Sequence, residues 1–177
     1  IETNIAWKLA LENKNSPTAL ILSRQNIKTL PATGKSRMES AEMAAKGAYI
    51  VTETSGKPDV IMVASGSEVA TLVEGAALLA GEDIKTRIVS APSEGLFRMQ
   101  DKKYRDSVLT PGIPVFCLTA GLPVTMLGFA GSEGRIWGLE SFGYSAPYNV
   151  LDQKFGFTGE NVAAQVKNYI NELNILK

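Results

Sequence analysis

The chain has 177 residues, of which 45% are hydrophobic and 20% charged, and its 18 basic residues balance its 18 acidic ones. This composition is typical of a globular protein with a sizeable core and excludes a disordered chain. The balanced charge argues against a nucleic-acid partner, which usually requires a basic excess, and the longest apolar runs are far shorter than the ~20 residues of a membrane helix.

The first 45 residues predict the end of one domain and a linker. Residues 2–13 carry an amphipathic helical pattern, and residues 18–23 are apolar enough to predict a buried strand. Residues 24–45 contain Pro31 and few apolar side chains, which indicates an interdomain linker, because long structureless loops are uncommon within a domain. We therefore assign residues 1–23 to the end of an upstream domain.

The remainder of the chain, residues 46–177, alternates between strand and helix patterns. Strands are expected over 47–53, 59–64, 84–90, 114–119 and 135–139, and helices over 68–80, 101–108, 147–155 and 160–175. The strand over 59–64 is almost wholly apolar, as expected for a sheet covered on both faces. The alternation predicts an α/β fold with a mostly parallel sheet and helices on both faces.

Two residue types limit the chemistry of the chain. There is no histidine, which removes the commonest general base, the Ser–His and Cys–His nucleophile pairs and the usual zinc and non-haem iron ligands. The single cysteine, Cys117, lies in an apolar run that predicts a buried structural thiol, and one cysteine without a disulfide is consistent with a reducing compartment. We expect no metal site and no complete active site. The first residue is Ile1 rather than Met, so we expect processing or a start further upstream.

The start of the helix predicted over 68–80 carries the sharpest local signal. Ser65, Gly66 and Ser67 form a candidate anion site, because a helix N-terminus presents unpaired N–H groups and the positive end of the helix dipole. The more ordinary interpretation is a capping box, in which Ser65 and Glu68 satisfy each other's N–H groups. Neither the Gly-x-Gly-x-x-Gly nor the Walker phosphate pattern is present.

Arg24 follows directly after the strand predicted over 18–23. An arginine at the carboxyl end of a strand can present its planar guanidinium to a phosphate or a carboxylate. The alternative is a surface or interdomain salt bridge.

Seven segments of the chain carry a family resemblance. Leu20-Ile21-Leu22-Ser23-Arg24-Gln25-Asn26 resembles the Leu-Ser-Arg-Gln-Asn segment near the end of the pyrimidine-binding domain of transketolases. Six further segments resemble the C-terminal domain of that family, in the same order: Gly47-Ala48-Tyr49-Ile50-Val51, Ala64-Ser65-Gly66-Ser67-Glu68-Val69, Val89-Ser90-Ala91-Pro92-Ser93, Tyr104-Arg105-Asp106-Ser107-Val108-Leu109, Phe142-Gly143-Tyr144-Ser145-Ala146-Pro147 and Phe155-Gly156-Phe157-Thr158. The ordered set spans essentially the whole chain, which is therefore identified as a C-terminal region of the transketolase family.

The resemblance implies a fold and an activity. The fold has three layers, with a mostly parallel, mixed sheet of about five strands and helices on both faces. The intact enzyme is a cytoplasmic homodimer of the pentose phosphate pathway that moves a two-carbon ketol unit between sugar phosphates with thiamine diphosphate and Mg or Ca. Because the family's cofactor lies between its first two domains, we expect this chain to bind no cofactor, to contain no catalytic residue and to be inactive alone.

The resemblance also gives Arg24 a role, since it matches the family arginine that contacts the substrate phosphate. The rest of the chain is implied to support the fold and the dimer, with the remaining transketolase domains and sugar phosphates as its partners. Two alternatives stay open. One is a related thiamine-dependent enzyme, such as a dihydroxyacetone synthase or a dehydrogenase β subunit. The other is a free-standing α/β module that binds an anion or a nucleotide at residues 65–68.

Overall fold

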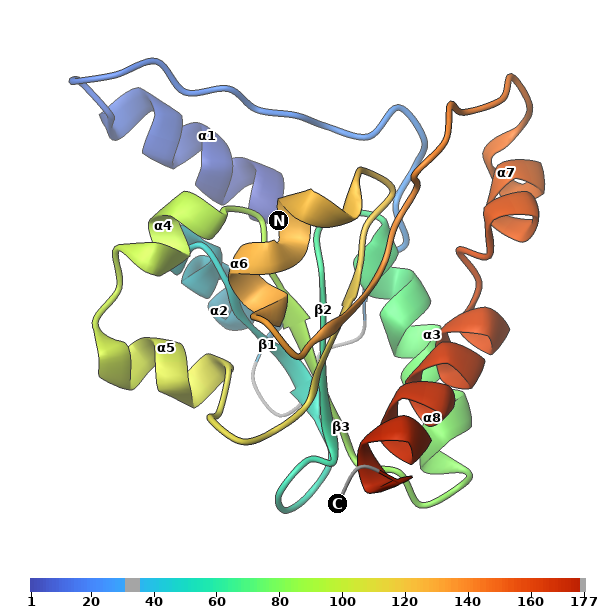
Figure 1. Ribbon diagram of the computed structural model, residues 1–177. Helices are drawn as coiled ribbons and strands as arrows, with labels where there is room; N and C mark the ends of the chain where they lie inside the picture. The colour runs from blue at the N-terminus through green and yellow to red at the C-terminus, as the bar shows by residue number, and fades with distance from the viewer. Residues whose placement is uncertain (31–35, 176–177) are drawn as a thin grey trace.

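The computed structural model describes residues 1–30 and 36–175 (Figure 1). The chain begins with α1 (Glu2–Glu12), continues as an extended segment to residue 30, and resumes with α2 (Arg37–Glu42) and the 3₁₀ helix η1 (Met43–Lys46). The remaining elements, in chain order, are β1 (Tyr49–Glu53), β2 (Val60–Ala64), α3 (Glu68–Ala80), β3 (Thr86–Ser90), α4 (Glu94–Arg98), α5 (Lys102–Val108), β4 (Val115–Leu118), η2 (Pro123–Met126), α6 (Leu127–Ala130), β5 (Arg135–Trp137), α7 (Tyr148–Phe155) and α8 (Gly159–Ile175).

The five strands form one mixed sheet in the order β1-β3-β2-β4-β5. β3, β2, β4 and β5 are parallel, and β1 runs antiparallel to β3 at one edge, with Tyr49 opposite Ser90. Every residue of β2 and of β3 is buried, as the apolar run over 59–64 predicts for strands in the middle of a covered sheet. The expected α/β fold with a mostly parallel, mixed sheet is confirmed.

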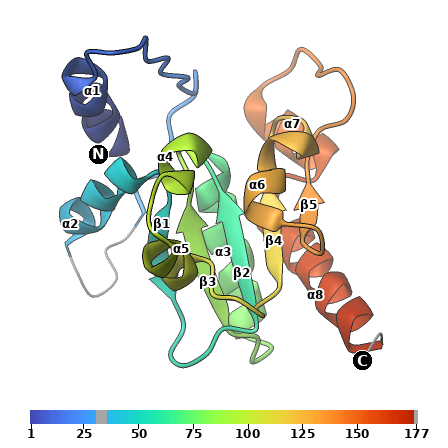
Figure 2. The ribbon, with the colours of Figure 1, turned by 60° about the vertical axis from the view of Figure 1, so that its left-hand side comes forward.

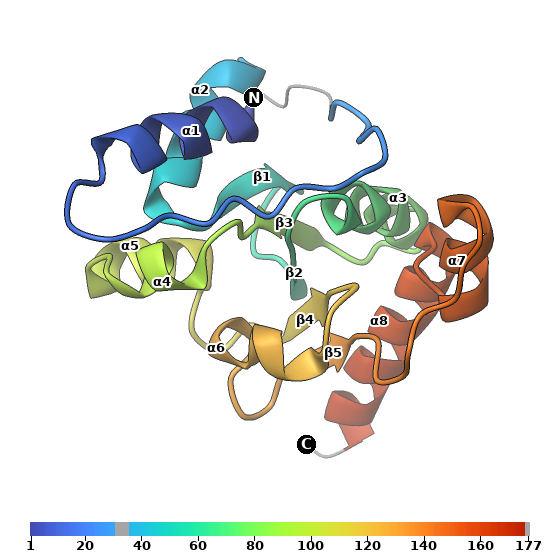
Figure 3. The ribbon, with the colours of Figure 1, turned by 90° about the horizontal axis from the view of Figure 1, so that it is seen from above.

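Helices cover both faces of this sheet. α3 and α8 lie on one face, and α4, α5 and α6 lie on the other (Figures 2 and 3). Successive residues of β2 point to opposite faces, so Met62 packs in the core under α3 and α8, while Ile61 and Val63 pack in the core under α4 to α6. α3 and α8 approach closely at Gly75, where an added Cβ would stand 2.7 Å from Cγ1 of Val162.

The strand expected over 18–23 is wrong. These residues are extended but form no strand, and Ile21 is 96% exposed. A strand needs a neighbour to satisfy its backbone N–H and C=O groups, and the described part of the chain places no other strand beside this segment. Within the described residues the segment therefore stays unpaired and exposed.

The stretch assigned as a linker, residues 24–45, contains helix. Residues 31–35 of it lie outside the described residues, but α2 and most of η1 fall within it. A capping box starts α2, in which Ser36 Oγ accepts from the backbone N–H of Glu39 and the Glu39 carboxylate accepts from the N–H of Ser36. Three short helices, α4, η2 and α6, each of at most five residues, were not predicted from the sequence.

Candidate functional site

The candidate site lies at the carboxyl edge of the parallel strands, where open α/β sheets bind ligands. The loops that leave β2, β3 and β4 meet at this edge. The extended segment after α1 runs across the same edge, from the side of α4 to the side of α3 (Figures 1 and 3). We call residues 18–30 the strap. Arg24 lies within the strap.

The strap is supported at both ends. Thr18, Ala19 and Leu20 line a cavity of about 160 Å³ together with residues of α1, η1 and α4. Ile27, Lys28 and Leu30 border a smaller cavity of about 80 Å³, together with Glu2, the start of α3 and the end of β3. Lys28 Nζ also donates to Glu74 Oε1 of α3 at 2.7 Å, and this carboxylate raises the pKa of Lys28.

Arg24 occupies the exposed middle of the strap. Within residues 1–30 and 36–175 its guanidinium forms no hydrogen bond or ion pair, so the alternative of a salt bridge is not realised among these residues. The local turn is held by Ser23, whose Oγ donates to the carbonyl oxygen of Gln25 at 3.1 Å. The guanidinium, with its five N–H donors, is therefore exposed and unpaired within these residues.

The start of α3 differs from the expected capping box. The helix is capped at Ser67 without a side-chain cap bond, and Gly66 makes the turn with a φ of +60°. The Glu68 carboxylate instead accepts from Ser67 Oγ at 2.6 Å and from the backbone N–H of Ala120 at 3.4 Å, in the loop after β4. The Ser65–Glu68 box is therefore wrong, because the Glu68 side chain crosses to the neighbouring loop.

The Glu68 carboxylate opposes anion binding at the candidate site formed by Ser65, Gly66 and Ser67. Burial raises the pKa of Glu68, although the hydrogen bonds from Ser67 and Ala120 act in the opposite direction. The three residues do share one turn at the carboxyl edge. An incoming anion would meet the Glu68 carboxylate there and compete with it for the Ser67 hydroxyl.

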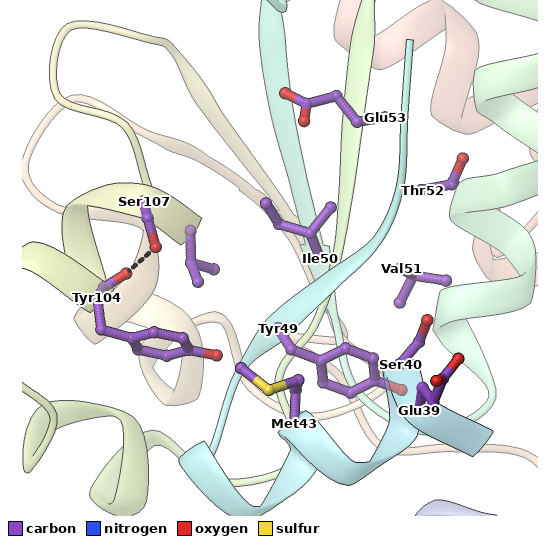
Figure 4. Close-up of a pocket in the computed structure, with 11 residues that line it drawn as sticks. Glu39, Ser40, Met43, Tyr49, Ile50, Val51, Thr52, Glu53, Tyr104 and Ser107 are labelled. Carbon is purple, nitrogen blue, oxygen red and sulfur yellow. Dashed lines mark hydrogen bonds between the residues drawn. The ribbon is translucent and has the colours of Figure 1, made fainter. Parts of the chain in front are cut away.

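A groove of about 710 Å³ runs along β1, between α2 and α5 (Figure 4). Tyr104 and Ser107 line one wall and Met43 the other. The polar groups of the α5 wall are occupied: Tyr104 Oη donates to the carbonyl of Ala48, and Ser107 Oγ donates to the carbonyl of Tyr104. Neither Arg24 nor the start of α3 borders this groove.

A further set of polar side chains, which sequence reasoning missed, lies below the strap. Glu2 Oε1 accepts from Tyr49 Oη at 2.7 Å and from Ser90 Oγ at 2.6 Å. The two donors are cross-strand neighbours on β1 and β3 and are almost completely buried. No sequence motif predicts these contacts, because Glu2 is 47 positions from Tyr49 and 88 positions from Ser90 in the sequence.

The described residues offer little to a metal ion or its cofactor. Over residues 1–30 and 36–175, no group of three or more His, Cys, Asp or Glu side chains is placed to hold a metal. They therefore do not by themselves fit a divalent metal with a bound diphosphate. The same ranges contain no helix that combines the length and the apolar character needed to cross a bilayer.

Comparison with known proteins identifies the family. The model of the transketolase-like C-terminal domain matches residues 47–158. Transketolase 2 of Vibrio parahaemolyticus is 42% identical over 171 residues, and transketolase 2 of Escherichia coli is 40% identical over 166 residues. These matches cover 96% and 93% of this chain but only 25% and 24% of the relatives, so the chain spans about a quarter of their length.

Solved structures agree with this assignment. The transketolase of Leishmania mexicana superposes with a TM-score of 0.86 at 36% identity, covering 97% of this chain and 24% of that one. A chain described as an inactive β4 tetramer of a split-gene transketolase shares the fold, with a TM-score of 0.56 at 19% identity over 72% of this chain and 43% of that one. These comparisons favour neither the related thiamine-dependent enzymes nor the free-standing binding module. The chain belongs to the transketolase family and contains its C-terminal domain.

Proposed function

We propose that this chain works as the C-terminal quarter of a transketolase. The intact enzyme would be a cytoplasmic homodimer that transfers a two-carbon ketol unit between sugar phosphates in the pentose phosphate pathway, with thiamine diphosphate and Mg or Ca. One observation carries the proposal: transketolase sequences match this chain over nearly its whole length. The cofactor ligands and the catalytic groups would come from the other three quarters.

In this enzyme Arg24 would bind the phosphate group of the substrate. Its position supports this role, because the guanidinium is exposed at the carboxyl edge and has no partner within residues 1–30 and 36–175. A planar guanidinium matches a phosphate with two parallel N–H···O bonds and fixes its orientation. The contact is distant from the reacting carbons, so it would contribute mainly to substrate binding. An anion at Ser65–Ser67 would have to displace the Glu68 carboxylate, so we assign the phosphate to Arg24.

The rest of the chain would support the fold and the dimer. Residues 46–177 would form the C-terminal domain, residues 24–45 its connection, and residues 1–23 the end of the pyrimidine-binding domain. Exposed apolar side chains lie on both parts: Leu11 and Ile21 near the strap, and Phe142 and Tyr148 before and within α7. Such surfaces mark protein contacts, here with the remaining domains or the second subunit.

A hybrid enzyme tests this proposal. The chain replaces the matching region of Escherichia coli transketolase 2, which is 40% identical to it. We expect the hybrid to transfer a ketol unit from xylulose 5-phosphate, the sugar named for a Pichia stipitis transketolase mutant complex, to an aldose phosphate. The isolated 177-residue chain should show no transfer. A folded hybrid without transfer, or an active isolated chain, contradicts the proposal.

A further inference from the structure

Residues 140–150 form a continuous exposed segment that leads into α7. It carries four large apolar or aromatic side chains, Phe142, Tyr144, Tyr148 and Val150, which we call the α7 patch. Each of them is at least 50% exposed, and Phe142 is 97% exposed. Single exposed apolar side chains are ordinary on a protein surface, whereas several within one short segment indicate a contact surface.

The helix α7 has little of the packing that a helix of its length requires. It has eight residues, and none of them is buried. Helices shorter than ~12 residues are marginal in water and gain most of their stability from packing. At its end Phe155 packs against the core, and Trp137 Nε1 donates to the Phe155 carbonyl at 3.2 Å. The helix is therefore attached at its end, while Tyr148 and Val150 near its start are exposed.

Contacts within the chain hold the α7 patch in a defined shape. The Tyr144 ring lies 5.8 Å from the Phe155 ring, centre to centre, and Lys154 Nζ lies 4.3 Å from the centre of the Tyr144 ring. Before the patch, the N–H of Leu139 donates to a carbonyl in the loop after β4 at 2.9 Å. Phe142 lies between these two attachments. A side chain presented from a segment held at both ends loses little freedom on binding, which favours association.

The α7 patch lies beside the end of the strap. α7 and the loop before it stand next to the last part of the strap in both Figure 1 and Figure 3. Lys28, in this part of the strap, pairs with Glu74, which raises the pKa of Lys28, and Tyr148 is close enough to add to the shift. The strap follows residues 1–23, which we assign to the end of an upstream domain. That domain would therefore stand close to the patch.

We infer that the α7 patch is the docking surface for the upstream domain of the same transketolase polypeptide, with Phe142 as its anchor. The inference rests on the proposed function and names the partner of this surface. The relatives are about four times as long as this chain, so such a polypeptide has the material to cover the patch. The partner surface would be apolar around Phe142, with polar groups for the hydroxyls of Tyr144 and Tyr148.

Cross-linking in the hybrid enzyme identifies the partner. A benzophenone is attached to Phe142→Cys in a hybrid whose other accessible cysteines are replaced; Cys117 can stay, because it is completely buried. We expect a cross-link within one polypeptide, mapped to the upstream domain. Met99→Cys is the control, since Met99 is 73% exposed at the end of α4, and it should give at least about tenfold less of this product. A product of twice the mass, which would mark the second subunit as partner, or equal yields from both positions would overturn the inference.

Hydrogen exchange tests the role of Phe142 as anchor. The amides of α7 should exchange at least about tenfold more slowly in the hybrid than in the 177-residue chain, because docking adds packing to the helix. Phe142→Ala should remove most of this protection in the hybrid. In the 177-residue chain the same change should alter exchange less than about twofold, because the side chain is exposed there. Phe142→Tyr keeps the ring and should keep most of the protection.

The outcomes separate this inference from the proposed function. If the hybrid folds but transfers no ketol unit, the proposed function fails. If an active hybrid and the 177-residue chain show the same exchange in α7, only the docking role of the patch fails. If Phe142→Ala speeds exchange equally in both proteins, Phe142 supports α7 within its own domain, and the inference is overturned.

Discussion

Two apolar segments of similar composition differ in burial in this molecule. Ile61, Met62 and Val63 in β2 are completely buried, whereas Ile21 and Leu22 in the strap are exposed. β2 is bonded on both sides, to β3 and to β4, and is covered by helices on both faces. The strap has no strand beside it within the described residues. An apolar run is buried only where the fold supplies both backbone partners and a covering layer.

Chemical labelling of thiols should show this contrast most strongly. Burial raises the pKa of the Cys117 thiol to about 12, and the side chain is inaccessible in β4. In an Ile21→Cys variant at pH 8, the new thiol should react at least ~10³ times faster than Cys117, which reacts only through opening of the core. A chromogenic disulfide reagent measures both rates, and urea should release Cys117. Comparable rates for the two thiols would contradict the assigned burial.

An ion pair in the sheet joins the buried Arg87 to the partly exposed Glu53, and it should contribute more stability than the exposed ion pairs. Arg87 pairs with Glu53 at 2.6 Å and also donates to the carbonyls of Ser107 and Val108 and to Thr110 Oγ1. Arg87→Ala leaves these acceptors without their donor, so the free energy of unfolding should fall by about 1–3 kcal/mol. Urea denaturation gives this value.

The control for Arg87 is an exposed pair on α4. Arg98→Ala removes an exposed ion pair with Glu94 and should change the free energy of unfolding by about 0.5 kcal/mol or less. If the two variants lose the same stability, the Arg87 network does not link β1, β3 and the end of α5 as described.

The same contrast explains what sequence reasoning could reach. The central strand and α3 were predictable, because Val60–Ala64 is uniformly apolar and the apolar spacing of α3 ends at Gly81. The capping pair Ser36 and Glu39 was readable but stood in a polar stretch that otherwise indicated a linker.

The polar contacts of the site were not predictable from spacing. Glu2 meets Tyr49 and Ser90 only because β1 and β3 pair in antiparallel register and place both hydroxyls at the edge where α1 docks. Likewise, the Glu68 carboxylate accepts from the backbone N–H of Ala120 in the loop after β4 and does not cap the start of its own helix. The phosphate role of Arg24 came from the family resemblance. The structure adds that Arg24 is exposed in the middle of the strap.

A smaller effect should appear in the pH dependence of stability. Burial raises the pKa of Glu68 above its ordinary value of 4.5, so the folded chain keeps a proton that the unfolded chain has released. The contribution of Glu68 to the free energy of unfolding therefore falls progressively as the pH rises through 4.5 toward the pKa of the folded state. Glu68→Gln should show a smaller decline than wild type between pH 4.5 and 7 in urea denaturation. Glu160→Gln, at the start of α8, serves as control. Parallel profiles for wild type and Glu68→Gln would contradict the assigned direction.

The decisive measurement is substrate preference in the hybrid transketolase with and without Arg24. Arg24→Ala should weaken the binding of a phosphorylated sugar by roughly 1.5–3 kcal/mol, as expected for a charged hydrogen bond. This corresponds to an increase in KM on the order of 10- to 100-fold. The same sugar without its phosphate should be used equally well by both forms. If the two sugars lose the same factor, Arg24 does not bind the phosphate, and the strap does not serve the active site in this way.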